Sequence, residues 1–484
     1  MRASIALSLA LLLLAPTAHA DAIDDLAPGA WYQIPNSKMR DVCPPNEPAY
    51  DWHFHCQNVT AAWNGGAVDT TRGRLLLWGG GHADYKGNEI YAFDFAALTW
   101  SLVWGPTPDA QIPSGGTHET YDDGNPGSRH TYSGLAYVPT TDNLLAMGGS
   151  LWQSGSYSGA TWAFSFGDGK WSRKADEGES DSFGDPSVFD PVSGHVFRRA
   201  NRRMQEYDPA ADTYTGRAQS NGGFWASNVS AALDPEARLM VIVGDGRVDL
   251  YHLDTDKYEQ DVAITGANAQ DLFGGSSPGI DFDPAQKKFV LWHGGLDVYT
   301  FDPVAKSFEK HAGSGDDPGA VTTSGGVFGR FRFIPSRNVF ARVNDVDEDV
   351  FVFRLAPGKG TPVTPPPPGS GGNGGGSGNG GASSGGTVGT GAAASAAPSD
   401  DSGCGCRQAR DSRTPTHGLA LFALAATLLR RRGRGLLRRE SPAGRSLERP
   451  EGSFVGHACR TPPFQMGGRF GPKPAGGTLP KTTA

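Results

Sequence analysis

Two short stretches of the sequence carry side chains that could perform acid-base chemistry, at 79–85 and 129–132. β-Elimination on a uronic-acid polysaccharide needs a base for the α-proton, an acid for the leaving oxygen and a group that neutralises the carboxylate. Imidazole, phenol and guanidinium groups can fill these roles, so the candidate catalytic residues of a polysaccharide lyase are His82, Arg129, His130 and Tyr132. Alternation along a strand would place His130 and Tyr132 on one side and Arg129 on the other, which counts against a lyase.

Aromatic side chains beside amides and carboxylates favour a second chemistry, the noncovalent binding of sugars. An aromatic ring covers the apolar C–H face of a pyranose while polar groups bind its hydroxyls. The candidate ligand-binding residues are Trp63, His82, Asp84, Tyr85, Trp225 and Asn228. The alternative is that Trp63, Tyr132 and Trp225 only fill the centre of the fold.

Histidines are common metal ligands, and imidazole nitrogens suit zinc or copper. Five histidines could converge in the folded protein: His53, His55, His82, His130 and His293. The sequence has no HExxH or CxxC spacing that would support a metal site. We therefore predict no cofactor, with a divalent metal as the alternative.

The N-terminus indicates export. Residues 1–20 contain Arg2, a short apolar run and the small-residue ending Ala18-His19-Ala20, which is the pattern of a cleaved signal peptide. Because an exported compartment permits disulfides, we predict that Cys43 pairs with Cys56, with two unpaired buried thiols as the alternative.

Charge and composition divide the rest of the chain. Residues 430–484 hold 12 basic and 3 acidic residues, whereas the preceding part holds 31 basic and 48 acidic residues. Since nucleic-acid binding requires a basic face, the acidic body argues against that partner. Residues 357–403 are almost entirely small, polar or proline residues and predict a disordered linker. Residues 21–356 then form one folded unit.

The folded unit repeats one pattern six times. Each repeat opens with two apolar or β-branched runs joined by an Asp-Pro or Pro-Thr type turn, near positions 65, 134, 187, 231, 280 and 332. The sixth repeat lacks a closing strand after 350–355, while the segment 29–35 has no partner of its own. We therefore predict an all-β propeller of about six four-stranded blades, closed by the N-terminal strand, which covers the free edges. Seven blades are the alternative if 105–128 contains further strands.

The stretch GGGHADYKGNEIYAFDFAALTW at 79–100 is similar to a kelch motif. Over about residues 29–356 the chain resembles the kelch or galactose-oxidase central-domain superfamily. The resemblance implies a β-propeller and leaves the activity open, because propellers host many functions. A galactose-oxidase-like enzyme would need copper and a tyrosine modified by cysteine, but the only cysteines of the body are the pair already assigned to a disulfide. We do not expect that activity.

The C-terminal region resembles the myxobacterial sorting signal. Its three parts are SGCGCR at 402–407, an apolar segment at 418–429 and the arginine cluster RRRGR at 430–434. The resemblance implies processing near Cys404 or Cys406 and membrane attachment through 404–434 at the cell surface or outer membrane, with release as the alternative. Residues 435–484 then form a disordered basic tail.

Together these patterns predict an exported, surface-displayed binding module. Its partner would be an extracellular carbohydrate or a protein, with carbohydrate favoured. The alternatives are a polysaccharide lyase and a scaffold for protein–protein interaction. We lean against enzymatic activity, because no candidate set meets the full requirement of a reaction.

Overall fold

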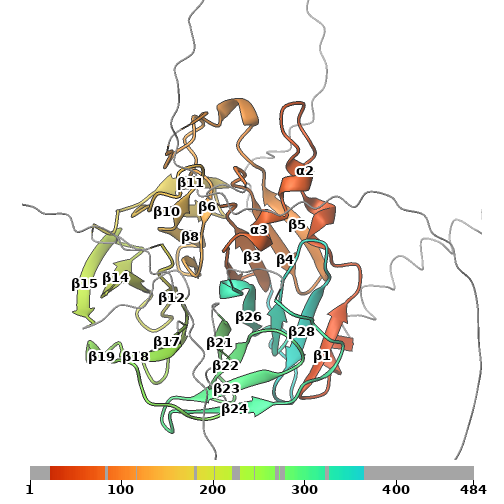
Figure 1. Ribbon diagram of the computed structural model, residues 1–484, viewed down its shortest axis with the longest axis vertical. Coiled ribbons are helices and arrows are strands. Elements are labelled where there is room, and N and C mark those ends of the chain that lie inside the picture. The colour runs from red at the N-terminus through yellow and green to blue at the C-terminus, as the bar shows by residue number, and fades with distance from the viewer. Residues whose placement is uncertain are drawn as a thin grey trace, which may run out of the picture. The chain divides into compact units, whose positions relative to one another are not determined.

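The computed structural model describes residues 22–81, 85–115, 117–178, 183–200, 202–220, 229–244, 246–267, 272, 278–321 and 326–364. The predicted signal peptide, the linker beyond residue 364 and the sorting tail lie outside these residues. The described part forms a ring of six β-sheets (Figure 1). This confirms the prediction of an all-β propeller with six blades.

The first strand of each blade lies at the centre of the ring, and later strands add outward in antiparallel order. Blade 1 contains β2 (Gly66–Asp69), β3 (Arg74–Trp78), β4 (Ile90–Asp94) and β5 (Thr99–Trp104). Blade 2 contains β7 (Leu135–Val138), β8 (Asn143–Met147), β10 (Thr161–Ser165) and β11 (Lys170–Arg173). Blade 3 contains β12 (Ser187–Phe189), β13 (Val196–Ala200), β14 (Arg203–Asp208) and β15 (Thr213–Gln219).

The second half of the ring repeats this arrangement. Blade 4 contains β16 (Val229–Asp234), β17 (Leu239–Gly244), β18 (Arg247–His252) and β19 (Lys257–Glu259). Blade 5 contains β21 (Gly279–Asp283), β22 (Lys288–Trp292), β23 (Val298–Asp302) and β24 (Ser307–His311), with β20 (Thr265–Gly266) parallel to β24. Blade 6 contains β26 (Phe331–Ile334), β27 (Val339–Arg342) and β28 (Val350–Arg354).

The N-terminal strand β1 (Ala30–Ile34) completes blade 6. It pairs with β28, as predicted, and the pairing is antiparallel, in a register that joins Ala30 to Arg354 and Ile34 to Val350. A short strand, β25 (Ser314–Gly315), runs parallel to the other side of β1. The two ends of the folded unit are therefore joined in one sheet, and closure of the ring depends on β1.

Aspartates shape the hairpins that hold the blades together. In the turn between β16 and β17, the Asp234 carboxylate accepts hydrogen bonds from the backbone N–H groups of Glu236 and Ala237, both at 3.0 Å. Arg238 then adopts a left-handed conformation, with φ of +55°. The same capping recurs at Asp94, Asp208, Asp283 and Asp302. Such side-chain caps specify a tight turn locally, which is why the turns could be predicted from the sequence.

The apolar core is divided into clusters between neighbouring blades. One cluster, for example, joins Val241 and Leu250 of blade 4 to Leu291 and Phe301 of blade 5. Six such clusters occupy the six boundaries of the ring. Each blade is thus buried on both faces, and its inner strand is left to border the centre.

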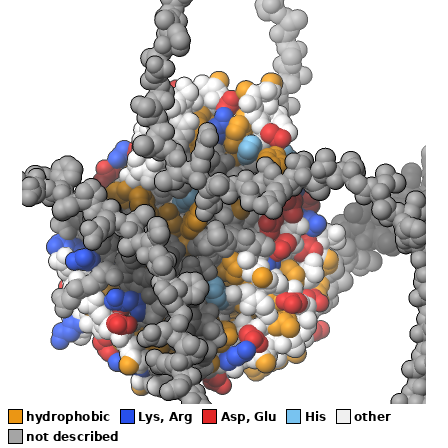
Figure 2. Space-filling model, in the orientation of Figure 1, with side chains coloured by type: hydrophobic (Ala, Val, Ile, Leu, Met, Phe, Trp, Pro, Cys, Tyr) orange, Lys and Arg blue, Asp and Glu red, His pale blue; other side chains and the backbone are white. Residues whose placement is uncertain are grey.

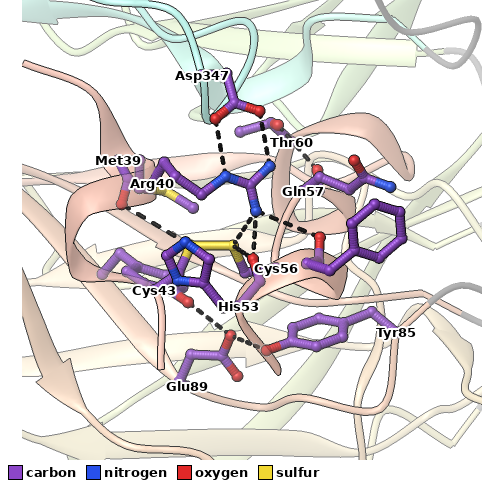
Figure 3. Close-up of a disulfide and its surroundings, with 12 residues drawn as sticks. Met39, Arg40, Cys43, His53, Cys56, Gln57, Thr60, Tyr85, Glu89 and Asp347 are labelled. Atoms are coloured by element: carbon purple, nitrogen blue, oxygen red, sulfur yellow. Dashed lines mark hydrogen bonds and ion pairs between the residues drawn. A yellow bond between two sulfur atoms is a disulfide. The ribbon is translucent and has the colours of Figure 1, made fainter. Parts of the chain in front are cut away.

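The segment 36–62 forms a compact cap beside blades 6 and 1 (Figure 3). It contains the 3₁₀ helix η1 (Met39–Val42) and the short helices α2 (Trp52–His55) and α3 (Asn58–Ala61). Cys43 and Cys56 form the predicted disulfide, with Cα atoms 6.1 Å apart. Arg40 makes two hydrogen bonds to the Asp347 carboxylate, at 2.7 and 2.8 Å, and donates to the His53 carbonyl. The cap is therefore fixed both covalently and to blade 6.

The long connection 105–128 adds no blade. Its described residues form one 3₁₀ turn, η2 (Asp109–Gln111), and an isolated bridge between Thr120 and Pro126. A two-stranded ladder follows it, between β6 (Arg129–His130) and β9 (Ser150–Leu151). Within the described part of the chain, no helix has the length and apolar character needed to cross a membrane.

Candidate functional site

Three aromatic residues stand at equivalent positions just before the inner strands of consecutive blades. Phe328, Trp63 and Tyr132 each precede by three residues the first residue of β26, β2 and β7, in blades 6, 1 and 2. All three have left-handed backbones, with φ of +50°, +49° and +49°. This conformation is unfavourable for bulky side chains, so the surrounding structure must impose it. We call residues 63–65, 130–133 and 328–330, which contain these aromatic residues, the entry segments.

Close backbone packing imposes the conformation. The Tyr132 N–H donates to the Trp63 carbonyl at 2.7 Å, and the Thr131 N–H donates to the Asn64 side-chain oxygen at 3.0 Å. A Cβ atom added to Gly65 would lie 2.2 Å from the Tyr132 carbonyl oxygen. Glycine is needed there because no side chain fits between the two blades. Arg330, in the 3₁₀ turn η4 (Phe328–Arg330), donates to the Asn64 carbonyl at 2.9 Å and so links blade 6 to blade 1.

The aromatic rings form a continuous row across these blades. Ring centroids are 5.1 Å apart for Trp63 and His130, 5.8 Å for His130 and Tyr132, and 5.7 Å for Tyr132 and Phe328. His130, Tyr132 and Phe328 are buried, whereas Trp63 is partly exposed. Burial raises the pKa of Tyr132 to about 12, so its phenol is neutral near pH 7. The row therefore presents one accessible ring, that of Trp63, supported by buried ones.

Arg129 belongs to a different environment, as strand alternation predicts. Its guanidinium is fully buried and donates to the Glu119 carboxylate at 2.7 Å, the Ser158 hydroxyl at 3.0 Å and the Gly127 carbonyl at 3.1 Å. Arg129 and the hydrogen bonds of Ser158 and Trp162 hold the pKa of Glu119 below its usual value against its burial. All three guanidinium nitrogens thus have acceptors within the protein, and Arg129 fastens the 105–128 connection to blade 2.

Tyr85 is also away from the aromatic row. It is fully buried and donates to the Glu89 carboxylate at 2.6 Å, and Tyr91 donates to the same oxygen at 2.8 Å (Figure 3). Tyr50 and Trp52 of the cap pack over its ring. Burial raises the pKa of Glu89. Tyr85 therefore stabilises the contact between cap and blade 1 and has no surface for a ligand.

The other predicted site residues lie outside the described residues: His82, Asp84, Trp225, Asn228, Cys404 and Cys406. The structure thus brings together Trp63, His130 and Tyr132, and separates Arg129 and Tyr85 from them. Phe328 was missed by the sequence analysis. Comparing the position three residues before each inner strand would have revealed it, since this position is aromatic in blades 1, 2 and 6.

No metal centre is evident among the residues that the structure describes, where no three His, Cys, Asp or Glu side chains group in a suitable way. His55 stacks on Tyr50 in the cap, with ring centroids 4.9 Å apart. His293 follows β22, and its burial lowers its pKa. These two histidines sit in separate surroundings.

Acidic side chains gather near β1 and β28 (Figure 2). They border a groove of about 360 Å³ whose lining includes Asp317, Asp347, Glu348 and Asp349. Asp347 is paired with Arg40, Glu348 with Arg342, and Asp349 accepts from Ser37 and Gln33. These three carboxylates already have partners within the protein, so the groove offers no obvious cation site.

Comparison of the sequence with protein-family models and with curated proteins found no match. The chemistry of the site must therefore be argued from its own residues. The aromatic row has a partly exposed indole, and its two ionisable members, His130 and Tyr132, are buried. The accessible part of the row is therefore the flat apolar ring of Trp63.

Proposed function

We propose that this propeller is a binding module that recognises carbohydrate on the face that contains the entry segments, at one end of the ring's central axis. The observation that carries the proposal is the set of three aromatic residues held in left-handed conformations on three consecutive blades. Each such conformation costs about 1 kcal/mol or more. Tyr132 and Phe328 lie in tight turns, closed by the Gly134 N–H on the Thr131 carbonyl and by the Arg330 N–H on the Val327 carbonyl. We take the purpose of these strained turns to be the placement of the aromatic row that supports Trp63.

Carbohydrate is the ligand class that this geometry favours. A partly exposed indole held rigidly by buried neighbours offers a flat apolar surface for the C–H face of a sugar. Polar partners are expected from His82, Asp84 and Asn228. Their flanking residues Gly81, Tyr85 and Val229 follow the second strand of blade 1 or begin the inner strand of blade 4. The described residues next to these connections lie near the entry segments, since the Gly80 N–H donates to the Arg129 carbonyl and the Ser133 hydroxyl lies 3.3 Å from the Val229 carbonyl.

The lyase receives no support from the described residues. Arg129 is occupied by Glu119 and backbone carbonyls, so it cannot also neutralise a uronate without breaking a buried ion pair. Tyr132 is neutral near pH 7 and mostly buried, which removes it as a base. Export and display at the cell surface also belong to the proposal, supported by the signal-peptide pattern, the tail and the disulfide.

The test compares Trp63→Ala with Trp104→Ala. Trp104 is also partly exposed but lies on the outer strand β5 of the same blade, which makes it a matched control. Affinity electrophoresis in gels containing neutral or uronic-acid polysaccharides should show retention of the native protein and of Trp104→Ala. Retention by Trp63→Ala should weaken at least about tenfold, or 1.4 kcal/mol.

Equal retention of the two variants would refute the role of Trp63. Failure of the native protein to bind any polysaccharide would refute carbohydrate as the ligand and favour a protein partner. Absorbance of an unsaturated uronate in the same samples would instead establish the lyase.

A further inference from the structure

The opposite end of the ring contains a cavity of about 340 Å³ that involves all six inner strands. One residue from each blade, placed at the end of its inner strand, forms an apolar ring around it: Val68, Tyr137, Phe189, Leu233, Phe282 and Phe333. Prolines of the following turns form the rim: Pro139, Pro191, Pro235 and Pro284. The mouth therefore lies on the side of the first hairpin turn of each blade, and every lining residue is among those described.

Contacts between described residues cross the axis at the other end of the cavity. The Ser133 hydroxyl of blade 2 lies 3.3 Å from both the Val229 carbonyl and the Ser230 hydroxyl of blade 4, which is not its neighbour in the ring. The turn η4 of blade 6 also contacts β16 of blade 4. These contacts span the axis at the level of the entry segments, and none of the entry-segment aromatics lines the cavity. We call this cavity, whose mouth lies at the first hairpin turns, the funnel.

One residue deeper along the inner strands, the lining of the funnel contains small and charged side chains. Three blades place alanines at this level, Ala67, Ala136 and Ala232, while blades 5 and 6 place Asp281 and Arg332 there. The walls above are apolar and the depth contains one opposite-charge pair, with Arg332 Nη1 4.0 Å from Asp281 Oδ1. A ligand that matches both levels has an apolar body and one polar group.

Asp281 and Arg332 together favour a polar group that carries no net charge. Asp281 accepts the N–H groups of Phe282 and Phe333, both at 2.9 Å, which fixes its carboxylate. Arg332 donates to the Ile280 carbonyl at 3.4 Å. An anionic group near Arg332 would also meet Asp281, and a cationic group near Asp281 would also meet Arg332. Burial raises the pKa of Asp281, which further disfavours a charge at this depth.

We propose that the funnel is a second binding site, for a small uncharged amphiphile that enters polar end first. Its hydroxyl- or amide-type group would accept from Arg332 and donate to Asp281, and its apolar body would contact the ring that includes Phe282 and Phe333. A volume of about 340 Å³ lies at the lower end of the range for small-molecule pockets. The site is independent of carbohydrate binding, because it uses other residues at the opposite end of the ring.

The experiment measures displacement of the apolar dye aminoanthracene from the full-length protein by three competitors that share one alkyl chain. These are decanol, decanoate and decyltrimethylammonium, which differ only in the charge of the head group. Decanol should displace the dye at a concentration at least about tenfold lower than either ion. Val68→Trp, which places a large ring at the partly exposed Val68 of the mouth, should abolish dye binding, whereas Trp63→Ala should leave it unchanged.

Two further variants leave the mouth of the funnel open and change only the charged pair in its depth. Asp281→Asn keeps an acceptor oxygen for one of the two backbone N–H groups and leaves Arg332 unopposed, so decanoate should become the strongest competitor. Arg332→Met keeps the side-chain volume and leaves Asp281 unopposed, so decyltrimethylammonium should gain instead. Reciprocal changes support the proposal. Absence of dye binding in the native protein, or an unchanged order of competitors in both variants, would overturn it.

Discussion

Closure of the propeller by β1 should carry a large part of its stability, and Trp31→Ala tests this. Trp31 is 2% exposed and packs against Trp292 of blade 5 and Phe353 of β28, with ring centroids 5.9 and 5.1 Å apart. Its indole N–H donates to the Leu296 carbonyl at 2.9 Å. The side chain thus joins the N-terminal strand to two blades that are distant in sequence.

The expected loss follows from these contacts. Replacing a buried tryptophan by alanine costs about 3–5 kcal/mol through lost packing and the cavity left behind. The Leu296 carbonyl also loses its donor, which adds about 1–3 kcal/mol if no water replaces it. A total near 5 kcal/mol is comparable with the whole free energy of unfolding of many proteins. We therefore expect Trp31→Ala to open the ring under conditions in which the native protein is folded.

Urea denaturation followed by far-ultraviolet circular dichroism gives the measurement, with Gln33→Ala as the control. Gln33 lies on the same strand but is exposed, and its side chain bonds only to Asp349 among the described residues. The control should lose less than about 1 kcal/mol. A loss below about 1 kcal/mol for Trp31→Ala as well would show that β1 is a dispensable edge strand and that the closure argument is wrong.

Two further predictions concern the cap. Reducing the Cys43–Cys56 disulfide, or replacing both cysteines by serine, should lower the free energy of unfolding by about 3 kcal/mol, because the bridge closes a loop with a sequence separation of 13. An unchanged thermal midpoint of unfolding in the presence of reductant would contradict this prediction. The pKa of Glu89 is raised by burial in the folded protein. The protonated Glu89 carboxyl therefore contributes its full stability below the ordinary carboxyl pKa range, and this contribution is lost as pH rises through the raised pKa. Each pKa unit by which the folded state exceeds the unfolded state corresponds to about 1.4 kcal/mol. Glu89→Gln should therefore gain stability relative to the native protein as pH rises above the ordinary carboxyl range in urea titrations, and parallel pH profiles would refute the assignment.

The features that sequence analysis predicted are those with local or paired signals. A capping aspartate and a left-handed residue four positions later, such as Asp234 and Arg238, specify a hairpin within a few residues. The closing strand could be predicted because the last repeat lacked a strand after 350–355 and the N-terminal segment 29–35 had no partner of its own. The disulfide required only two cysteines in the body and an exporting signal.

The site residues were harder to predict because their roles depend on segments that are distant in sequence. Arg129 looked available for a substrate, but its guanidinium donates to the Glu119 carboxylate of the long connection 105–128. Tyr85 looked like a loop residue, but Tyr50 and Trp52 of the cap bury it. The funnel could not be predicted from the sequence, since each blade contributes only a few residues to it and these have the pattern of ordinary strand ends.

The path of the chain after β28 bears on how the two ends of the propeller would be used. The Thr361 N–H donates to the Pro335 carbonyl, and Val363 lies against Gly73, so residues 357–364 follow the first hairpin turns of blades 6 and 1. These turns are on the side where the funnel opens. The part of the predicted linker that the structure describes therefore leaves the propeller at the funnel end, with the entry-segment aromatics at the other. The two proposed sites therefore lie at opposite ends of the propeller, and the described start of the linker lies beside the end at which the funnel opens.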